Sequence, residues 1–491
     1  MLPALFFFTL HAQPGELASQ SERAKELMSA GRFEEAIPIY KKLVQAVPGN
    51  TGLLLNLGLA QHMAGHEREA VPNFEAVLKS DPKLLPALMS LGAARLALNE
   101  PQLAVVPLRK AVASHPDNHE ASGMLADALM ELGHFNEAAE QYRKLTELSP
   151  DDPRAWYGLG KNYEAIAANA FEQMRKANPQ SPYIAALVAD TRVQSRQYRS
   201  AFFFYKEALK QLPNLHGLHA ALADVYRKTG HADWAAAEDA KERELPPPDC
   251  KKHAGECQFI GGHDVQAAAS PPATAPMADA LYWQAKAANE LALQAFFRLG
   301  QLSPSVEMHR LKAEIARNHR QHPEAVKEWR AALELAPGDP RLRQEVAVSL
   351  FMAADYKAAL AEATALLKLA PQSPELNFVA GDSLLHLEEP DKAIPYLRAA
   401  LTADPKLLEA HASLGLALQR IGKSSEAVPH LEKAQDLDDD GSLHYQLARA
   451  YQAAGEAEKA RAAMAKYQEI VKRNDATKAQ VERETQIEPP K

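Results

Sequence analysis

The chain has 491 residues, with 63 acidic and 55 basic side chains that give a formal net charge of −8. The two signs are interspersed, without the basic stripe typical of proteins that bind nucleic acid, so we expect no nucleic-acid partner. The composition is rich in Ala, Leu, Glu, Lys and Gln, which favours helices.

Residues 1–12, MLPALFFFTLHA, form a short apolar run that matches no later part of the chain. The run is too short to span a bilayer, and it resembles a signal peptide that lacks the usual basic start. We therefore expect export to the periplasm or cell envelope. The alternative is a frayed apolar N-terminus on a cytoplasmic protein. No other stretch approaches transmembrane length, so we expect no integral membrane span.

Residues 51–84 show the unit that the chain repeats. Apolar residues three and four apart predict two amphipathic helices. Gly65 lies where the first helix must end and the chain must turn, and Pro82 ends the second helix because it cannot continue the hydrogen-bond ladder. A single hairpin of this kind has no core of its own, so it needs neighbours on both faces.

Three kinds of residue recur in register with this unit. A small residue lies early in each second helix: Ala36, Ala70, Ala104, Ala138, Ala201, Ala235, Ala325, Ala359, Ala393, Ala427 and Ala460. An aromatic ring often follows four residues later, as at Tyr40, Phe74, Tyr142, Tyr205 and Trp329. A proline commonly follows after a further eight: Pro48, Pro82, Pro116, Pro150, Pro213, Pro337, Pro371 and Pro405.

This pattern resembles the tetratricopeptide repeat family, whose period is about 34 residues. The resemblance covers nearly the whole chain. It implies an all-α, right-handed superhelical solenoid of stacked helix-turn-helix hairpins, of which we count about 13 units, two of them irregular. It also implies that the first helix of each hairpin lines a concave groove, where members of the family usually bind protein or peptide partners.

The domain organisation follows from these units. We expect a signal peptide, an N-terminal array of four units, an irregular unit with two regular ones, a cysteine-containing linker, a C-terminal array of one irregular and five regular units, and a polar tail that frays into disorder. Their boundaries are 1–12, 13–152, 153–249, 250–278, 279–474 and 475–491.

The first irregular unit begins at Pro153 and lacks a turn residue where one is expected. It is either a shortened hairpin or one long helix through residues 162–177. A second irregular unit over 279–305 repeats its landmarks, which favours an internal duplication. The matching landmarks are Trp156, Ala170, Phe171 and Pro179, and then Trp283, Ala295, Phe296 and Pro304.

Cys250 and Cys257 are the only cysteines and lie in the same linker. In an exported protein a disulfide between them is the leading interpretation. Two free thiols are the second. The third is a metal site that adds His253 and His263, since two thiolates and two imidazoles suit zinc, although the spacing matches no zinc module. We expect no bound cofactor or metal.

The run Phe202–Phe203–Phe204 exceeds what one helix face needs. We expect it to pack against the irregular helix before it or the cysteine linker after it. The alternative is an exposed apolar patch that binds a partner.

Exposed positions of the first helices are candidate partner-binding residues. In the N-terminal array they form an apolar patch, and in the C-terminal array they mix rings with charges, as peptide interfaces do. The candidates are Leu55, Leu59, Met89, Gln344, Phe351, Phe378, Asp382, Tyr445 and Arg449. Scattered apolar surface residues are the alternative interpretation.

The chain carries no zinc-protease, phosphate-loop or serine-hydrolase motif, so we expect no enzyme. The acidic run at Asp438 lacks the alternating ligands of a calcium loop and predicts a helix start instead. The leading expectation is a non-catalytic scaffold that binds peptide or helix segments of partner proteins in its groove. The alternative is a metal- or redox-responsive module centred on Cys250 and Cys257.

Overall fold

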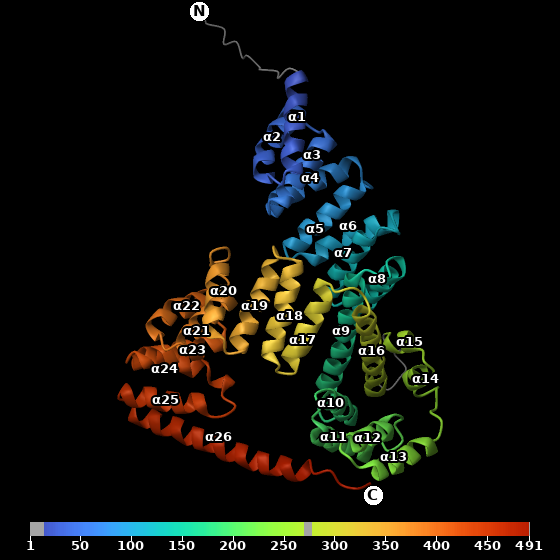
Figure 1. Cartoon of the computed structure of the whole chain (residues 1–491), viewed down its shortest axis with the longest axis vertical. Helices are drawn as coiled ribbons and strands as arrows, with labels where there is room; N and C mark the ends of the chain where they lie inside the picture. The colour runs from blue at the N-terminus through green and yellow to red at the C-terminus, as the bar shows by residue number, and fades with distance from the viewer. Residues whose placement is uncertain (1–13, 270–276, 491) are drawn as a thin grey trace, which may run out of the picture. The chain divides into compact units, whose positions relative to one another are not determined.

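The computed structural model describes residues 14–269 and 277–490. Across these residues the chain forms 26 α-helices and one short 3₁₀ helix, with no β-strand, so the all-α prediction is confirmed (Figure 1). None of the described helices is long and apolar enough to cross a membrane. The expected signal peptide lies outside the described residues.

Successive helices pair into eleven hairpins in the described part of the chain, the number of regular units expected. They are α1 (Pro14–Ser29) with α2 (Phe33–Ala46), α3 (Thr51–Met63) with α4 (Glu67–Ser80), α5 (Leu85–Ala97) with α6 (Pro101–Ser114), α7 (His119–Glu131) with α8 (Phe135–Leu148), α10 (Pro182–Gln194) with α11 (Tyr198–Gln211), α12 (Leu218–Lys228) with α13 (Ala232–Glu244), α17 (Val306–Asn318) with α18 (His322–Leu335), α19 (Pro340–Met352) with α20 (Tyr356–Leu367), α21 (Pro374–His386) with α22 (Pro390–Ala403), α23 (Leu408–Arg420) with α24 (Ser424–Lys433), and α25 (Ser442–Ala453) with α26 (Ala457–Glu484).

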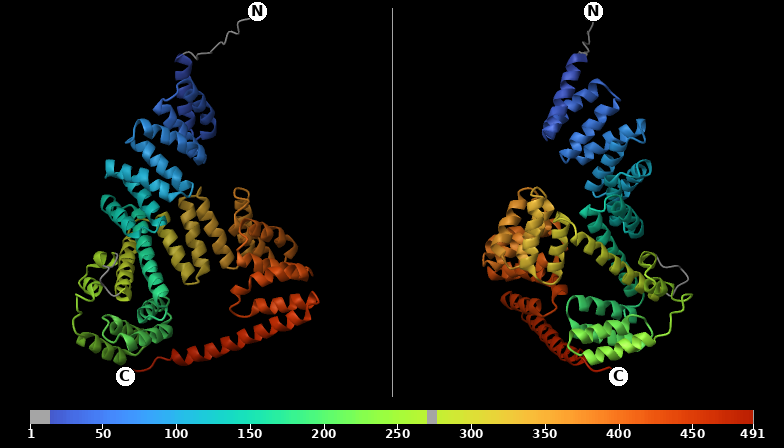
Figure 2. Two further views of the ribbon diagram at one scale, coloured as in Figure 1. Left: turned by 180° about the vertical axis from the view of Figure 1, so that it is seen from behind. Right: turned by 45° about the vertical axis from the view of Figure 1, so that its right-hand side comes forward.

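The chain folds into two compact units. The first contains Met1–Met174 and Asp249–Leu299, and the second contains Arg175–Pro248 and Gly300–Lys491. Each unit therefore takes two separate stretches of the sequence. Within the first, α1 to α8 stack hairpin upon hairpin, and within the second, α17 to α26 do the same (Figure 2).

The turn inside each hairpin needs one residue in the left-handed backbone region. Gly65 supplies it with φ +81°, at no steric cost because glycine has no Cβ. Five other hairpins place a residue with a Cβ there, which the spacing of glycines does not reveal. These residues, with φ between +56° and +62°, are Asn99, Arg196, Arg320, Ala354 and Glu388.

The core of each hairpin forms where its two helices approach most closely. The recurring alanines of the second helices, from Ala36 to Ala427, are almost fully buried, as their register predicted. Gly58 of α3 shows why a small residue is needed: a Cβ there would lie 2.7 Å from the Phe74 ring of α4. Ala460 is only half-buried, and its hairpin is the last among the described residues.

The first irregular unit is one continuous helix, α9 (Pro153–Ala177), so of the two alternatives the long helix is confirmed. The second is also continuous, α16 (Met277–Gly300). The two helices meet within the first compact unit: a Cβ on Gly160 of α9 would lie 2.3 Å from the Phe296 ring of α16. The glycine-to-side-chain contact of a regular hairpin is therefore made here between helices that are far apart in the sequence.

Candidate functional site

The first helices of neighbouring hairpins contact one another within each array. In the first unit α3 contacts α5 and α5 contacts α7; in the second unit α19 contacts α21, α21 contacts α23, and α23 contacts α25. Their outward residues therefore lie side by side in a strip, which we call the first-helix surface. The candidate partner-binding residues are all on these helices.

In the second unit this surface carries a cluster of rings. Phe351 of α19 lies 5.8 Å from the Phe378 ring of α21 and 5.8 Å from the Tyr356 ring of α20, measured between centroids. Tyr356 stacks on His386 at 4.2 Å with parallel planes. We call these four residues the aromatic cluster. Phe351 and Phe378 are half-buried, so both remain partly accessible to solvent.

Sequence analysis named Phe351 and Phe378 but missed Tyr356 and His386. The missed residues lie at the ends of their helices, outside the periodic positions. Closeness in the sequence could have identified Tyr356, because Phe351 and Tyr356 lie on either side of the same tight turn.

Asp382 lies on α21 beneath this cluster and is not an exposed groove residue as expected. The residue is 8% exposed, and the Ser413 hydroxyl of α23 donates to its carboxylate at 2.5 Å. His386 Nε2 lies 3.4 Å from its other oxygen. Asp382 therefore links α21 to α23 and holds His386 in the cluster. It can affect the binding of a partner protein only indirectly, by positioning His386.

Two candidates are open to solvent. Tyr445 of α25 is 40% exposed, with its ring 5.6 Å from that of Tyr467 in α26, and Arg449 lies exposed one turn further along α25. A ring and a guanidinium one turn apart on one helix present a π-face and a forked hydrogen-bond donor together. Gln344 of α19 is half-buried.

The apolar candidates of the first unit are more enclosed. Leu55 and Leu59 of α3 are half-buried and pack against a core cluster that includes Phe74 and Leu91. Met89 of α5 packs against the next cluster. These side chains serve mainly to join neighbouring hairpins, so the first-helix surface of the second unit is the stronger candidate site.

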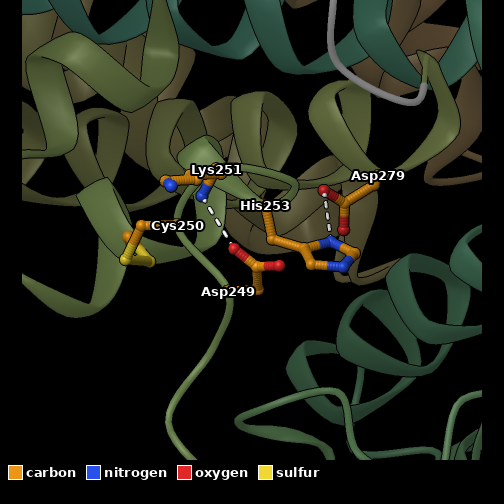
Figure 3. The surroundings of a disulfide bond; sticks show 6 residues. Asp249, Cys250, Lys251, His253 and Asp279 are labelled. Carbon is orange, nitrogen blue, oxygen red and sulfur yellow. Dashed lines mark hydrogen bonds and ion pairs between the residues drawn. A yellow bond between two sulfur atoms is a disulfide. The ribbon is translucent and has the colours of Figure 1, made fainter.

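Residues 250–269, which we call the cysteine segment, are helical in part, whereas a loop and linker were expected. The segment forms the short helices α14 (Ala254–Ile260) and α15 (Asp264–Ala268), and a disulfide joins Cys250 to Cys257 with Cα atoms 5.6 Å apart (Figure 3). His253 Nδ1 lies 3.1 Å from the buried Asp279 carboxylate of α16. The two cysteine sulfurs are bonded to each other. Within the described residues, no group of three or more His, Cys, Asp or Glu side chains is arranged to hold a metal.

This segment is held against α16 by one large ring. Trp283 is 1% exposed and packs 5.3 Å from the Phe259 ring of α14. A Cβ on Gly255 would lie 2.9 Å from the Trp283 Cβ, so α14 approaches α16 as closely as backbone allows. The Gln284 amide donates to the carbonyls of Ala268 and Ala269 at 3.2 Å. The segment is thus a packed layer of the first unit.

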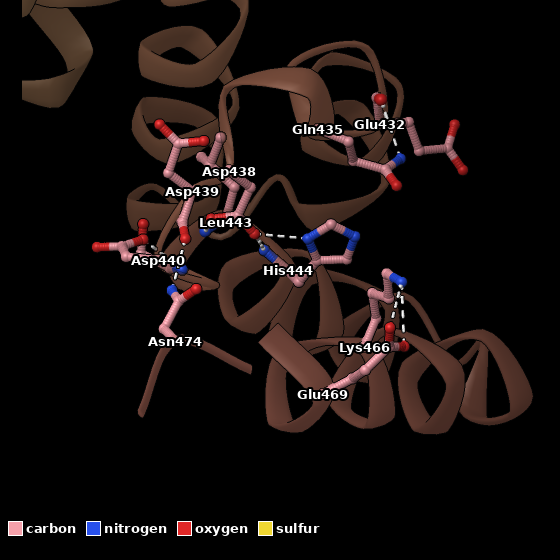
Figure 4. Close-up of polar contacts among 11 residues, drawn as sticks. Glu432, Gln435, Asp438, Asp439, Asp440, Leu443, His444, Lys466, Glu469 and Asn474 are labelled. Carbon is pink, nitrogen blue, oxygen red and sulfur yellow. Dashed lines mark hydrogen bonds and ion pairs between the residues drawn. The ribbon is translucent and has the colours of Figure 1, made fainter. Parts of the chain in front are cut away.

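The acidic run caps the start of α25, as predicted (Figure 4). Asp438 accepts hydrogen bonds from the backbone N–H groups of Leu443 at 3.0 Å and His444 at 2.8 Å, and its carboxylate lies 2.5 Å from His444 Nδ1. The Ser442 backbone N–H donates to Asp440, which lowers the pKa of that carboxyl. The carboxylates are thus engaged by a helix N-terminus, where negative charge is favourable.

The Phe202 run is packed within the second compact unit. Phe202 is 2% exposed, and its ring lies 5.8 Å from Tyr226 of the following hairpin. Phe203 and Phe204 are half-buried and lie 5.3 Å apart. The run is not a fully exposed patch.

Comparison with known families adds an independent observation. Models described as tetratricopeptide repeat match residues 27–83, 95–161, 347–407 and 408–440. The chain belongs to the tetratricopeptide repeat family. The matches fall in both compact units and cover mainly regular hairpins. One match extends into the start of α9, and none reaches α16 or the cysteine segment. No curated protein matches the chain.

Some solved structures are similar to parts of the chain. A MamA crystal structure is 23% identical over 40% of this chain and 92% of its own, with a TM-score of 0.30. A tetratricopeptide repeat protein from Parabacteroides merdae is 14% identical over 68% of this chain and 98% of its own, with a TM-score of 0.32. YrrB, described as a tetratricopeptide repeat protein with an unusual peptide-binding site, is 22% identical over 41% and 87%, with a TM-score of 0.28.

Proposed function

We propose that this tetratricopeptide repeat protein is a non-catalytic scaffold of the cell envelope that binds a peptide or helix of a partner protein. The observation that carries the proposal is the first-helix surface of α19 to α25. It presents half-buried rings, an exposed tyrosine and an exposed arginine along one strip. Aromatic residues and arginine are the side chains that dominate binding energy at protein interfaces.

The arrangement suits an extended or helical segment. The rings of Phe351 and Phe378 come from successive first helices and offer apolar contacts, while Arg449 offers hydrogen bonds to carboxylates or backbone carbonyls further along the strip. The rings are fixed by their neighbours, so little conformational entropy is lost when a partner binds.

Site-specific photocrosslinking tests the surface. A benzoylphenylalanine placed at position 445 should capture a discrete partner from envelope extract, and adding Arg449→Glu should reduce that adduct about tenfold. The matched control carries the same label at Leu369, which is 75% exposed and lies after the second helix α20. Equal capture from both positions, or capture that ignores Arg449→Glu, would contradict the proposal.

The envelope location is a separate part of the proposal and rests on residues 1–12. Expression of the full chain in the native organism, followed by fractionation and N-terminal sequencing, should give a processed protein in the envelope fraction. An unprocessed protein in the cytoplasmic fraction would refute the location without touching the binding surface.

The metal- or redox-responsive alternative has less support. The sulfurs of Cys250 and Cys257 form a disulfide, and His253 lies against Asp279. Elemental analysis and thiol titration of the purified chain would revive this alternative only if they found bound zinc or two titratable thiols.

A further inference from the structure

Residues 485–490 of the polar tail, which composition predicts to be disordered, contact other helices of the chain. Helix α26 runs to Glu484, and residues 485–490 then lie on α11, α12 and α13, which belong to the same compact unit (Figures 1 and 2). Composition predicted disorder because the tail is polar and ends in prolines. The contacts that hold it come from residues far away in the sequence.

Glu488 makes two polar contacts with these helices. Lys206 Nζ of α11 lies 2.6 Å from its carboxylate, and the Tyr226 hydroxyl of α12 donates to its backbone carbonyl at 2.7 Å. One contact recognises the charge of the side chain and the other recognises the backbone, so together they fix both the position and the direction of the segment.

Tyr226 is well prepared for this role. It is 1% exposed, with its ring held 5.8 Å from Phe202 and 5.7 Å from Trp234. Burial, and then the nearby charges of Glu238 and Glu488, raise the pKa of Tyr226 to about 12. The hydroxyl therefore stays protonated, and remains a donor, throughout the physiological range.

The prolines that follow Glu488 lie against an apolar surface. Pro489 and Pro490 border a partly open cavity of about 310 Å³, whose other walls include Phe202, Leu209 and Leu222. Proline has a preset backbone and no N–H to satisfy, so it binds such a surface at small entropic cost. Residues 485–487 lie further along, beside residues 196–200 and His231, in an open cleft of about 950 Å³.

The charges around the cavity favour an acidic ligand. Lys206, Lys210 and Lys241 border it. Lys210 pairs with Glu207 and Lys241 with Glu238, which is itself 2% exposed. Glu238 lies 2.5 Å from His219 Nδ1 and 2.9 Å from Lys241 Nζ. An incoming carboxylate therefore meets Lys206, and the Glu238 carboxylate is already engaged by His219 and Lys241.

From these contacts we propose that α11, α12 and α13 form a second peptide-binding site, selective for an acidic residue followed by two prolines, with the chain's own residues 485–490 as its resident ligand. A partner segment with the same chemistry must displace the tail before it binds. The site is separate from the first-helix surface of α19 to α25, so either proposal can fail without the other.

Binding of a labelled peptide tests this site directly. The probe is a fluorescent peptide of residues 484–491, ETQIEPPK, followed by anisotropy against the full chain and against a chain that ends at Glu484. The shortened chain should bind it at least about tenfold more tightly, because in the full chain the tethered tail competes at high effective concentration. Equal binding to both chains, or binding to neither, would overturn the proposal.

A charge swap in the shortened chain identifies the residues that select the peptide. Lys206→Glu should weaken binding about tenfold or more, and a peptide carrying Glu488→Lys should restore it. Tyr226→Phe should weaken binding about fivefold, through loss of one neutral hydrogen bond. The matched control is Lys228→Glu on α12, where Lys228 pairs with Asp224 away from the cavity. Unchanged binding by the Lys206→Glu chain, with native helicity, would refute the site.

Discussion

The contact of Gly381 with Leu397 and that of Gly160 with Phe296 share one feature: a glycine lets a large side chain of another helix approach closely. They differ in how far apart in the sequence the two helices lie. A Cβ on Gly381 of α21 would lie 2.7 Å from Leu397 Cγ, in the second helix of the same hairpin. A Cβ on Gly160 of α9 would lie 2.3 Å from the Phe296 ring, in α16. Local sequence links the first pair, whereas a long stretch that belongs largely to the other compact unit separates the second.

The difference lies in what surrounds each contact. Leu397 is fully buried, and its backbone nitrogen would lie 3.2 Å from the added Cβ, so neither atom can yield. Phe296 is half-buried, and its ring can swing toward solvent. A close approach inside a hairpin is therefore rigid, and the same approach between α9 and α16 is adjustable.

The largest expected effect is at the rigid contact. Gly381→Ala should lower the free energy of unfolding by about 2 kcal/mol, because overpacking outweighs the gain in helix propensity. Urea unfolding of the full chain, with hydrogen exchange of α21 and α22, measures it. Gly123→Ala is the matched control: its nearest side-chain atom would be 3.7 Å away, so it should be stabilising by about 0.5–1 kcal/mol. Equal effects at both glycines would contradict the rigid contact.

A smaller effect is expected at the adjustable contact. Gly160→Ala should cost about 1 kcal/mol or less, because the Phe296 ring moves aside. Adding Phe296→Leu should recover most of the loss, since the shorter side chain makes room. The double-mutant cycle, read from hydrogen exchange of α9 and α16, reports the coupling. Two independent, additive effects would show that α9 and α16 are not paired through these residues.

These contacts also show how far sequence reasoning reaches. A period of about 34 residues predicts which neighbours pair, so the regular hairpins and their buried alanines were predicted. The period says nothing about partners beyond the neighbouring unit, so the contact of Gly160 with Phe296 and that of Glu488 with Lys206 were missed. Ala354 was missed as a turn residue because only a glycine would have signalled a left-handed backbone there.

The candidate site was predicted in part for a related reason. Helical spacing identified Phe351 and Tyr445 on the first helices, but it could not tell that Asp382 is buried by Ser413 of the next hairpin. The burial of a first-helix residue depends on the packing of its neighbours, which a single repeat does not contain.

The smallest expected effect is a change in the pH dependence of stability. It distinguishes two hairpins that differ in the polar pair between their helices. His309 of α17 lies 2.7 Å from Glu328 of α18, whereas His411 of α23 lies 2.8 Å from His430 of α24. Burial lowers the pKa of both His411 and His430, with Lys433 close to both. The unfolded chain therefore binds protons more readily than the folded one, and stability falls as the pH drops below about 6.5.

The matched change is His430→Glu, which copies the acidic pair of α17 and α18. A carboxylate beside His411 should raise the pKa of that imidazole. The new pair therefore stabilises the folded chain fully below about pH 6.5, and this stabilisation is lost as the pH rises through the raised pKa. Hydrogen exchange of α23 and α24 between about pH 5 and 8 should change about threefold in wild type, with the opposite sign in the variant. The same sign in both chains would rule out the histidine pair as the cause.

The contact between α9 and α16 has a consequence for synthesis on the ribosome. In the hairpins α1 to α8 each helix packs on its sequence neighbours, so these hairpins can fold as they emerge. Gly160 of α9 can be covered only after Phe296 has been synthesised. At about 5–20 residues per second, the intervening chain takes roughly 7–27 s to synthesise. During that interval the face of α9 that α16 covers is exposed to water, so the nascent chain presents an apolar surface that chaperones can bind before the first compact unit is complete.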